Sequence, residues 1–360
     1  LFVKNNTASQ IGGGICLSSG GVFDNCEISN NLAALSGAGV YKGGSQYLTF
    51  NNCTINENEI TGDGGGNLNN GRGVAICDVS YNSRLIIDNS IIRGNKYSLP
   101  WTTRRSIIWL TSNLFLSNVL LDSNNTSLSY GSSYIIDSDD NNENDSIIFS
   151  NVKIVNNISS GVRLYDSDNQ YNYITCCASY LLFENTLIAN NSGIGVHSYN
   201  YEPIFNHVSI SNNALDTNFF NSYGDGLQVL LENGNMLTSG LYANYFSSTF
   251  INSIITTDPN ASKPPISWYN DSADTITFIN CNITNLAQLS NFHSSASVDY
   301  PQIISQNNID DQYLFVDELN GDFSLNDYSA CIGAAMDTSL SLPLDLDGNS
   351  RPNPVGSNAD

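Results

Sequence analysis

The densest acidic run of the sequence lies at residues 137–145 and contains Asp137, Asp139, Asp140 and Asp145. Carboxylate and carbonyl oxygens are the ligands that Ca²⁺ takes in proteins, so these four aspartates are the candidate metal ligands. A solvated loop without a metal is the alternative that the same composition allows. Ca²⁺ is the one cofactor that the sequence leaves open.

Aromatic residues gather in two other stretches. Trp101 lies in one of them, and Tyr165, Tyr171 and Tyr173 lie in the other. A tyrosine or tryptophan ring presents an apolar face and a polar tip, which suits stacking on a sugar ring. We therefore take these four as candidate glycan-binding residues. Aromatic side chains that simply pack on the underlying fold are the alternative.

The element that must position these side chains is a nonapeptide that recurs nine times, 22 to 45 residues apart. Its sixth residue is Ile or Leu in every copy, and its ninth residue is Asn in seven copies. The first residue is large and apolar: Phe23, Phe50, Ile87, Leu116, Phe149, Phe183, Phe205, Phe250 and Phe278. The third residue is His207 in one copy and asparagine in the other eight: Asn25, Asn52, Asn89, Asn118, Asn151, Asn185, Asn252 and Asn280.

Self-similarity at such a period indicates a solenoid. Short β-branched runs bounded by Asn and Gly favour strands over helices. If each copy forms one strand of a coil, equivalent residues stack about 4.8 Å apart. Asparagine tolerates the left-handed backbone of a tight bend, and its amide both donates and accepts, so the third-residue column is predicted to form a structural ladder. The pattern predicts an all-β parallel β-helix of about ten coils.

These columns resemble those of bacterial right-handed parallel β-helix repeat proteins of the pectin-lyase-like superfamily, over essentially the whole chain. The resemblance implies a single-stranded right-handed parallel β-helix, with the coils in residues 1–290. Residues 291–360 resemble the closing segment of secreted or surface-anchored members, in which an anchoring or secretion domain usually follows. The chain opens with a sequence that matches the end of a copy, Leu1-Phe2-Val3-Lys4-Asn5-Asn6, so we expect a segment of a longer protein.

The resemblance also suggests where to look for catalysis. Polysaccharide lyases of this superfamily combine an Arg or Lys base with calcium held by carboxylates, which makes Arg104 and Arg105 the candidate bases beside the acidic run. Hydrolases of the polygalacturonase type use paired aspartates, commonly followed by Gly-His-Gly, and this sequence lacks that motif. No catalytic residue is therefore assigned, and the chain is expected to be a non-enzyme rather than an enzyme.

Composition narrows the class of partner. Asp and Glu outnumber Lys and Arg 34 to 12, and a net charge of −22 excludes nucleic acid and anionic membrane surfaces as partners. No apolar run approaches the roughly 18–20 residues of a membrane span, so no membrane insertion is expected. The eight cysteines lack zinc-site spacing. Cys26, Cys53 and Cys281 share one column, which predicts small buried residues or a Cys26–Cys53 disulfide.

The fifth residue of each copy should face outward, because it lies between inward positions. Four copies place an aliphatic residue there, Ile91, Leu120, Leu187 and Ile254. So many apolar side chains on an outer face predict that a loop of the chain or a partner covers them.

Three functions fit the sequence. The first is an extracellular or cell-surface structural and adhesive module, part of a larger secreted protein or filament, whose partners are polysaccharide or identical stacked subunits. The second is a calcium-dependent polysaccharide lyase or other carbohydrate-active enzyme. The third is a non-catalytic glycan-binding module that uses the aromatic stretches. The regularity of the repeat and the scarcity of bases favour the first.

Overall fold

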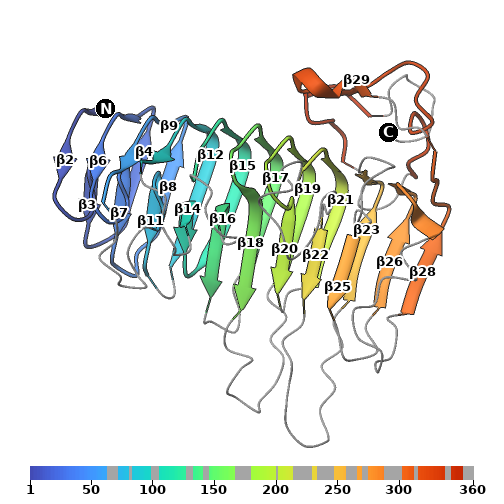
Figure 1. Ribbon diagram of the computed structural model, residues 1–360, viewed down its shortest axis with the longest axis horizontal. Helices are drawn as coiled ribbons and strands as arrows, with labels where there is room; N and C mark the ends of the chain where they lie inside the picture. Colours follow the sequence, from blue (N-terminus) through green and yellow to red (C-terminus); the bar gives the residue numbers. More distant parts are fainter. Residues whose placement is uncertain are drawn as a thin grey trace, which may run out of the picture.

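The computed structural model describes residues 1–62, 72–80, 83–98, 105–126, 133–140, 146–166, 180–199, 202–213, 229–232, 247–256, 266–269, 275–287, 302–311, 315–336 and 342–351. Within these ranges the chain winds as a right-handed parallel β-helix, as predicted (Figure 1). Successive coils lie side by side from β2 and β3 at the blue N-terminal end to β28 at the orange end.

Three parallel sheets run along the described coils. The fifteen-stranded sheet contains β1 (Phe2–Lys4), β4 (Gly21–Asp24), β5 (Glu27–Ser29), β8 (Leu48–Asn51), β9 (Thr54–Asn56), β12 (Arg84–Arg93), β15 (Asn113–Asp122), β17 (Ser146–Val155), β19 (Tyr180–Ala189), β21 (Glu202–Ser211), β23 (Ser247–Ile251), β24 (Ile254–Ile255), β26 (Thr275–Ile279), β27 (Asn282–Ile283) and β28 (Gln302–Gln306). The nine-stranded sheet contains β3 (Ile15–Leu17), β7 (Val40–Lys42), β11 (Ile76–Asp78), β14 (Arg105–Leu110), β16 (Ser133–Asp140), β18 (Ser160–Asp166), β20 (Val196–Tyr199), β22 (Val229–Glu232) and β25 (Ile266–Tyr269). The four-stranded sheet contains β2 (Thr7–Ala8), β6 (Leu32–Ala33), β10 (Glu59–Ile60) and β13 (Lys96–Tyr97).

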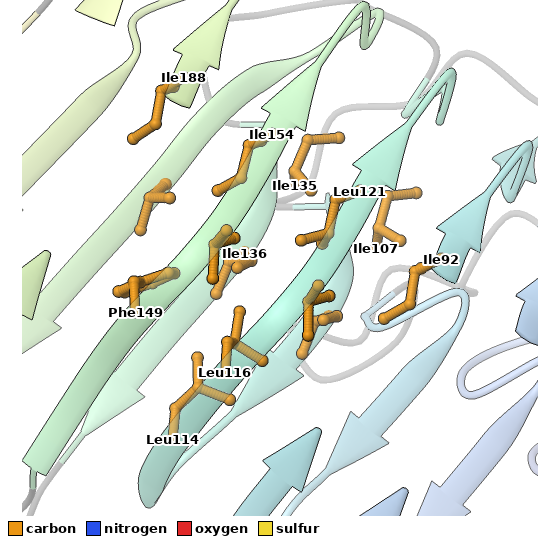
Figure 2. Close-up of a cluster of buried hydrophobic side chains, with 14 of the residues drawn as sticks. Ile92, Ile107, Leu114, Leu116, Leu121, Ile135, Ile136, Phe149, Ile154 and Ile188 are labelled. Atoms are coloured by element: carbon orange, nitrogen blue, oxygen red, sulfur yellow. The ribbon is translucent and has the colours of Figure 1, made fainter. Parts of the chain in front are cut away.

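The nonapeptide forms the strands of the fifteen-stranded sheet, and its copies pair in register. Phe149 lies opposite Leu116 on one side and Phe183 on the other, and Ile154 lies opposite Leu121 and Ile188. The first and sixth residues of the copies face the nine-stranded sheet, and Figure 2 shows them meeting Ile107, Ile135 and Ile136 in the shared core. Like side chains therefore stack on like along the core.

The third residue of each copy bends the strand. In all nine copies it has a left-handed backbone, with φ between 46° and 55°, including His207 at 54°. Asparagine accepts this conformation at low cost, because its short polar side chain can hydrogen-bond locally. The amides stack in part of this column, since Asn151 Nδ2 donates to Asn118 Oδ1 at 3.1 Å and Asn185 Nδ2 donates to Asn151 Oδ1.

A continuous ladder runs instead through the ninth residue of the copies. It consists of eight asparagines: Asn6, Asn31, Asn58, Asn95, Asn124, Asn157, Asn191 and Asn213. Each of the first seven donates from its backbone N–H and its side-chain amide to the Oδ1 of the next, as Asn124 does to Asn157 at 2.9 and 3.1 Å. The remaining amide proton of Asn124 goes to the backbone oxygen of Ile92 at 3.0 Å. Buried amides thus satisfy one another from coil to coil.

The phenylalanine column contributes a large share of the core. The Phe149 and Phe183 rings stack with centroids 4.5 Å apart, and both side chains are fully buried. We expect Phe149→Ala to lower the free energy of unfolding by about 3–5 kcal/mol, because it removes a buried ring and leaves a cavity between two coils. Urea denaturation followed by circular dichroism measures this. Ile148→Ala, one residue away on the outer face, is the control, and equal losses in the two variants would contradict the packing role.

Residues 315–336 and 342–351, which we call the closing segment, leave the stack and fold back over the C-terminal coils (Figure 1). The segment begins with the antiparallel pair β29 (Phe315–Asp317) and β30 (Asp322–Leu325), joined by the 3-10 helix η4 (Glu318–Asn320). Within the described residues, parallel pairing continues to β28, and Ile309 still bridges Asn282. The closing segment contacts the outer face of the fifteen-stranded sheet through Lys153–Asp347, Asn185–Arg351, Asn190–Glu318, Asn252–Met336 and Asn282–Cys331.

The sequence predicts that a loop of the chain or a partner covers the outer-face column of aliphatic residues, and on the C-terminal coils the closing segment lies over it. Leu187, between Asn185 and Asn190, is 8% exposed, whereas Ile91, in a coil that the described residues of the closing segment do not contact, is 38% exposed. A segment of the chain itself, rather than a partner, therefore lies over this column from Lys153 onward.

Candidate functional site

One registered column of residues on the nine-stranded sheet points away from the core. Its members are Cys16, Tyr41, Cys77, Trp109, Asp137, Arg163 and His197. The alternate residues on the same strands, such as Ile136 and Val162, belong to the core. From Cys77 to His197 the column is at most 9% exposed. We call Tyr134, Asp137, Arg163 and His197 the central polar cluster.

Asp137 and Arg163 form a two-pronged ion pair between neighbouring coils. Arg163 Nε donates to Asp137 Oδ1 at 2.8 Å, and Arg163 Nη2 donates to Asp137 Oδ2 at 2.9 Å. The exposed fractions of the two residues are 1% for Asp137 and 6% for Arg163. A guanidinium matched to a carboxylate in this geometry satisfies both buried charges. The pair therefore fixes the register of β16 and β18.

Tyr134 and His197 complete the central polar cluster. The Tyr134 hydroxyl lies 2.9 Å from Nδ1 of His197, and the Arg163 guanidinium carbon lies 5.2 Å from the centre of the Tyr134 ring. All four side chains are buried and engaged with one another. A hydroxyl, an imidazole and a carboxylate are the ordinary groups of acid–base chemistry. In this arrangement they hold three coils together rather than face an approaching substrate.

Arg105 does not join this cluster. It begins β14 and is registered with Ser133, four residues before Asp137, which separates the two backbones by about 13 Å along the strand. Its Nη1 donates to the backbone oxygen of Thr126 at 3.4 Å, and its guanidinium lies 4.9 Å from the Tyr97 ring centre. Burial lowers the pKa of Arg105 and raises the pKa of Tyr97. The hydrogen-bonded partner of Asp137 across the coils is Arg163.

The rest of the acidic run is placed only in part. Residues 137–140 belong to the strand β16. Asp139 is registered with Tyr165 and Asp140 with Asp166. Arg104, Asp145, Trp101, Tyr171 and Tyr173 lie outside the described residues. Among the residues that are described, no three His, Cys, Asp or Glu side chains gather as a metal site requires, and the calcium ligand set stays a prediction.

The sequence holds a further signal for the central polar cluster. The Gly-rich stretches before strands of the nine-stranded sheet, such as Gly39-Val40-Tyr41, continue as Gly161-Val162-Arg163 and Gly195-Val196-His197. Alignment of these Gly-Val-X stretches would have placed Arg163 and His197 in one column. The nonapeptide alone, which lies on the other sheet, could not.

A second buried charge pair lies at the inner side of the nine-stranded sheet. Lys42 and Asp78 are registered on β7 and β11, and both are fully buried. Lys42 Nζ lies 3.1 and 3.2 Å from the two Asp78 oxygens, and it also donates to Ser80 Oγ at 3.0 Å and Ser83 Oγ at 2.6 Å. Burial lowers the pKa of Lys42, and Asp78 opposes that shift. The ammonium is satisfied entirely from within the solenoid.

His207 takes the place of asparagine at the bend. Its Nδ1 lies 2.9 Å from Asn206 Oδ1, and its Nε2 lies 3.2 Å from Asn252 Nδ2. A neutral ring donates from Nδ1 and accepts at Nε2, which matches both partners. Burial, together with the positive charge of Arg351, lowers the pKa of His207 to about 4.

This shift predicts an acid-labile bend. The unfolded chain takes up a proton at His207 near pH 6.5, whereas the folded chain does so only near pH 4, so stability falls as the pH falls through that window. We expect the contribution to be on the order of 3 kcal/mol. Urea denaturation at about pH 7 and about pH 4.5 measures it, with His207→Asn as the matched variant, because the other titrating groups are common to both chains. Identical pH dependence in the two would contradict the assignment.

The described cysteines are free thiols, namely Cys16, Cys26, Cys53, Cys77, Cys281 and Cys331. Cys26 and Cys53 stack in one column as predicted, and the small-residue interpretation holds in place of the disulfide. Cys53 Sγ donates to the backbone oxygen of Phe23 at 3.2 Å. Burial raises the pKa of Cys281 to about 12, which leaves it an unreactive thiol.

Asp345-Leu346-Asp347-Gly348-Asn349 is a turn held by its own side chain. Asp345 Oδ1 accepts from the backbone N–H of Asp347 at 2.9 Å and of Asn349 at 2.7 Å, and Oδ2 accepts from Asn349 Nδ2. Gly348 has φ of 86°, the left-handed backbone that glycine adopts freely. The Asp345 carboxylate is thus occupied by its own loop.

The comparisons with known proteins bear on the fold. Residues 1–138 match the family model described as a right handed beta helix region. Neither the curated proteins nor the solved structures contain a match to this chain. No helix in the described part of the chain combines the length and the apolar character that a membrane span requires.

Proposed function

We propose that the chain is an extracellular structural and adhesive β-helix module, a segment of a larger secreted or cell-surface protein or filament. The observation that supports the proposal is that the basic side chains contact other groups of the chain itself. Of the twelve Lys and Arg side chains, Arg104 and Lys263 lie outside the described residues, and each of the other ten contacts a carboxylate, an aromatic ring or a carbonyl oxygen of the chain itself.

These contacts mostly join different coils. Arg93 reaches Asp122 at 2.8 Å, Lys4 reaches Glu27 at 2.6 Å, and Arg163 reaches Asp137. A lyase needs a base that faces its substrate, whereas a stalk needs coils that hold their register. Lys and Arg side chains that pair with groups on neighbouring coils support the role of a stalk. The partners of such a module would be polysaccharides or further β-helical coils stacked on its ends.

Two measurements test the proposal. The first is antibody labelling of intact cells of the source organism, which we expect to succeed without permeabilisation; labelling only after permeabilisation would overturn the extracellular role. The second is incubation of the chain with a panel of uronic-acid polysaccharides and Ca²⁺, followed by ultraviolet absorbance of unsaturated sugar ends. We expect no product, and steady product formation would replace the structural role with a polysaccharide lyase.

A further inference from the structure

A row of polar and aromatic side chains crosses five coils on the outer face of the fifteen-stranded sheet. It contains Tyr47, Arg84, Asn113, Ser146 and Tyr180, and we call it the Tyr47–Tyr180 row. Arg84 is registered with Asn113, and Ser146 with Tyr180. Tyr47 directly precedes Leu48, which pairs with the residue after Arg84, and Asn113 Oδ1 accepts the Ser146 N–H at 2.8 Å. Four coil steps give the row a length of about 19 Å.

Arg84 is held in this row by aromatic rings alone. Its guanidinium carbon lies 5.1 Å from the ring centre of Tyr47 on the preceding coil and 4.7 Å from that of Phe115 on the following coil. Within the described part of the chain its guanidinium donates no hydrogen bond, and its Nε is buried without a partner. Every other described arginine finds an oxygen acceptor or has further partners. Within the described residues, the Nη1 and Nη2 N–H groups of Arg84 therefore have no protein acceptor, and they are the donors left for a ligand.

The two ends of the row are exposed tyrosines. Tyr47 is 57% exposed and Tyr180 is 47% exposed. Exposed rings of this kind offer an apolar face to a sugar. Among the described residues, the hydrogen bonds and ion pairs of the closing segment with these strands lie at the bend or beyond it, at Lys153, Asn185 and Asn190, and not on the residues of this row.

The charges along the row limit what can lie on it. Arg84 is its one cation, and the position registered with Tyr180 on the next coil is Glu202. The chain as a whole carries a net charge of −22, which repels a densely charged polyanion at long range. A chain with a single anionic group among neutral units avoids that repulsion and still meets the guanidinium.

We infer that the Tyr47–Tyr180 row binds a linear glycan that carries one anionic sugar among neutral ones. The oxyanion, a carboxylate or a sulfate, accepts two hydrogen bonds from the Arg84 guanidinium, and the neighbouring sugar rings stack on Tyr47 and reach toward Tyr180. The inference deepens the proposed adhesive function by naming a ligand class, and it rests on that function for its biological setting.

Isothermal titration calorimetry of the full chain tests the inference with four tetrasaccharides. One carries a single uronate among neutral sugars, one carries a single sulfate, one is wholly neutral and one is wholly uronic. We expect a singly charged probe to bind about tenfold or more tighter than the neutral probe, because the guanidinium contact is charge-assisted. The two singly charged probes distinguish carboxylate from sulfate as the preferred anion.

Variants assign the binding to this row. We expect Arg84→Gln to remove the preference for the charged probe, and Tyr47→Ala to weaken all of them, with unchanged melting temperatures as the check on folding. Arg93→Gln, which removes an arginine paired with Asp122 elsewhere on the same strand, is the matched control. Equal binding of neutral and charged probes, tighter binding of the wholly uronic probe, unaltered binding by Arg84→Gln, or no binding of any probe would each overturn the inference. Cell-surface labelling and the absence of cleavage would stand in all four cases, so failure here is distinct from failure of the proposed function.

Discussion

Lys42→Met is expected to lower the free energy of unfolding by about 3–5 kcal/mol, the cost of leaving a buried partner charge uncompensated. Lys42 and Asp78 are both fully buried, and the Lys42 ammonium is held by the Asp78 carboxylate, Ser80 and Ser83. The substitution keeps the length of the side chain and removes the charge, so Asp78 stays behind in the core. Urea denaturation followed by circular dichroism gives the loss.

The double variant Lys42→Met, Asp78→Asn is the control that separates charge from shape. Asparagine keeps an acceptor for the Ser80 backbone N–H, which Asp78 Oδ1 accepts at 3.1 Å. We expect the double variant to recover most of the stability, to within about 1–2 kcal/mol of the parent, because no buried charge remains. If the double variant is as unstable as Lys42→Met, the loss comes from packing, and the stranded Asp78 charge is not its cause.

The second large effect is expected at the buried ladder. Asn157→Ala removes the acceptor for the Asn124 backbone N–H and side-chain amide, and it removes the donor to the Leu121 oxygen at 3.2 Å. At 1% exposure these groups have no water to replace the lost partner. We expect a loss of about 4 kcal/mol in the free energy of unfolding, since each stranded buried group costs roughly 1–3 kcal/mol.

Asn151→Gly is the matched control for the ladder. Asn151 lies six residues earlier in the same coil, at the bend, with φ of 55°. Glycine adopts that backbone freely, so we expect a loss of less than about 1 kcal/mol. The comparison distinguishes an asparagine that is needed for its amide from one that is needed for its backbone. Equal losses at the two positions would remove that distinction.

The fold could be predicted because the repeat places one kind of residue in one column. A large apolar residue followed two positions later by asparagine is typical of a core strand that bends. Nine copies of this pattern indicate a solenoid. The prediction falls short where a copy departs from the pattern. On β28, Ser305 stands where the other copies have a large apolar residue, and it is registered with Phe278 of β26. Two residues later, Asn307 has the left-handed backbone of the bend, with φ of 52°. A pattern that requires a large apolar first residue therefore misses that coil.

The two asparagine columns show a limit of a different kind. Sequence reasoning assigns the self-satisfying ladder to the third residue of the copies, because that column is nearly invariant. The column at the ninth residue, such as Asn124 and Asn157, carries the continuous buried ladder. The recurrence of asparagine at a position indicates that asparagine is required there. Whether it is required for its backbone conformation or for its side-chain amide depends on how deeply the position is buried.

The sequence alone could not predict which arginine pairs with Asp137, and the reason is geometric. Whether Asp137 meets Arg105 or Arg163 depends on strand register across coils of unequal length, and a shift of four residues separates the two outcomes. Arg84 illustrates the same point, because its neighbours Tyr47 and Phe115 lie on different coils, far away in the sequence. Such contacts follow from the lengths of the connecting segments, which carry no periodic signal.

The closing segment changes how the solenoid can come apart. In a simple stack each coil contacts only its neighbours, so end coils can unravel one at a time. Here the ion pair of Lys153 with Asp347 joins residues 194 positions apart, and the contacts of Asn252 and Asn282 tie later coils to the same segment. Loss of any one of these coils on its own must break contacts that the others share. The C-terminal coils are therefore coupled into one cooperative unfolding unit through the closing segment.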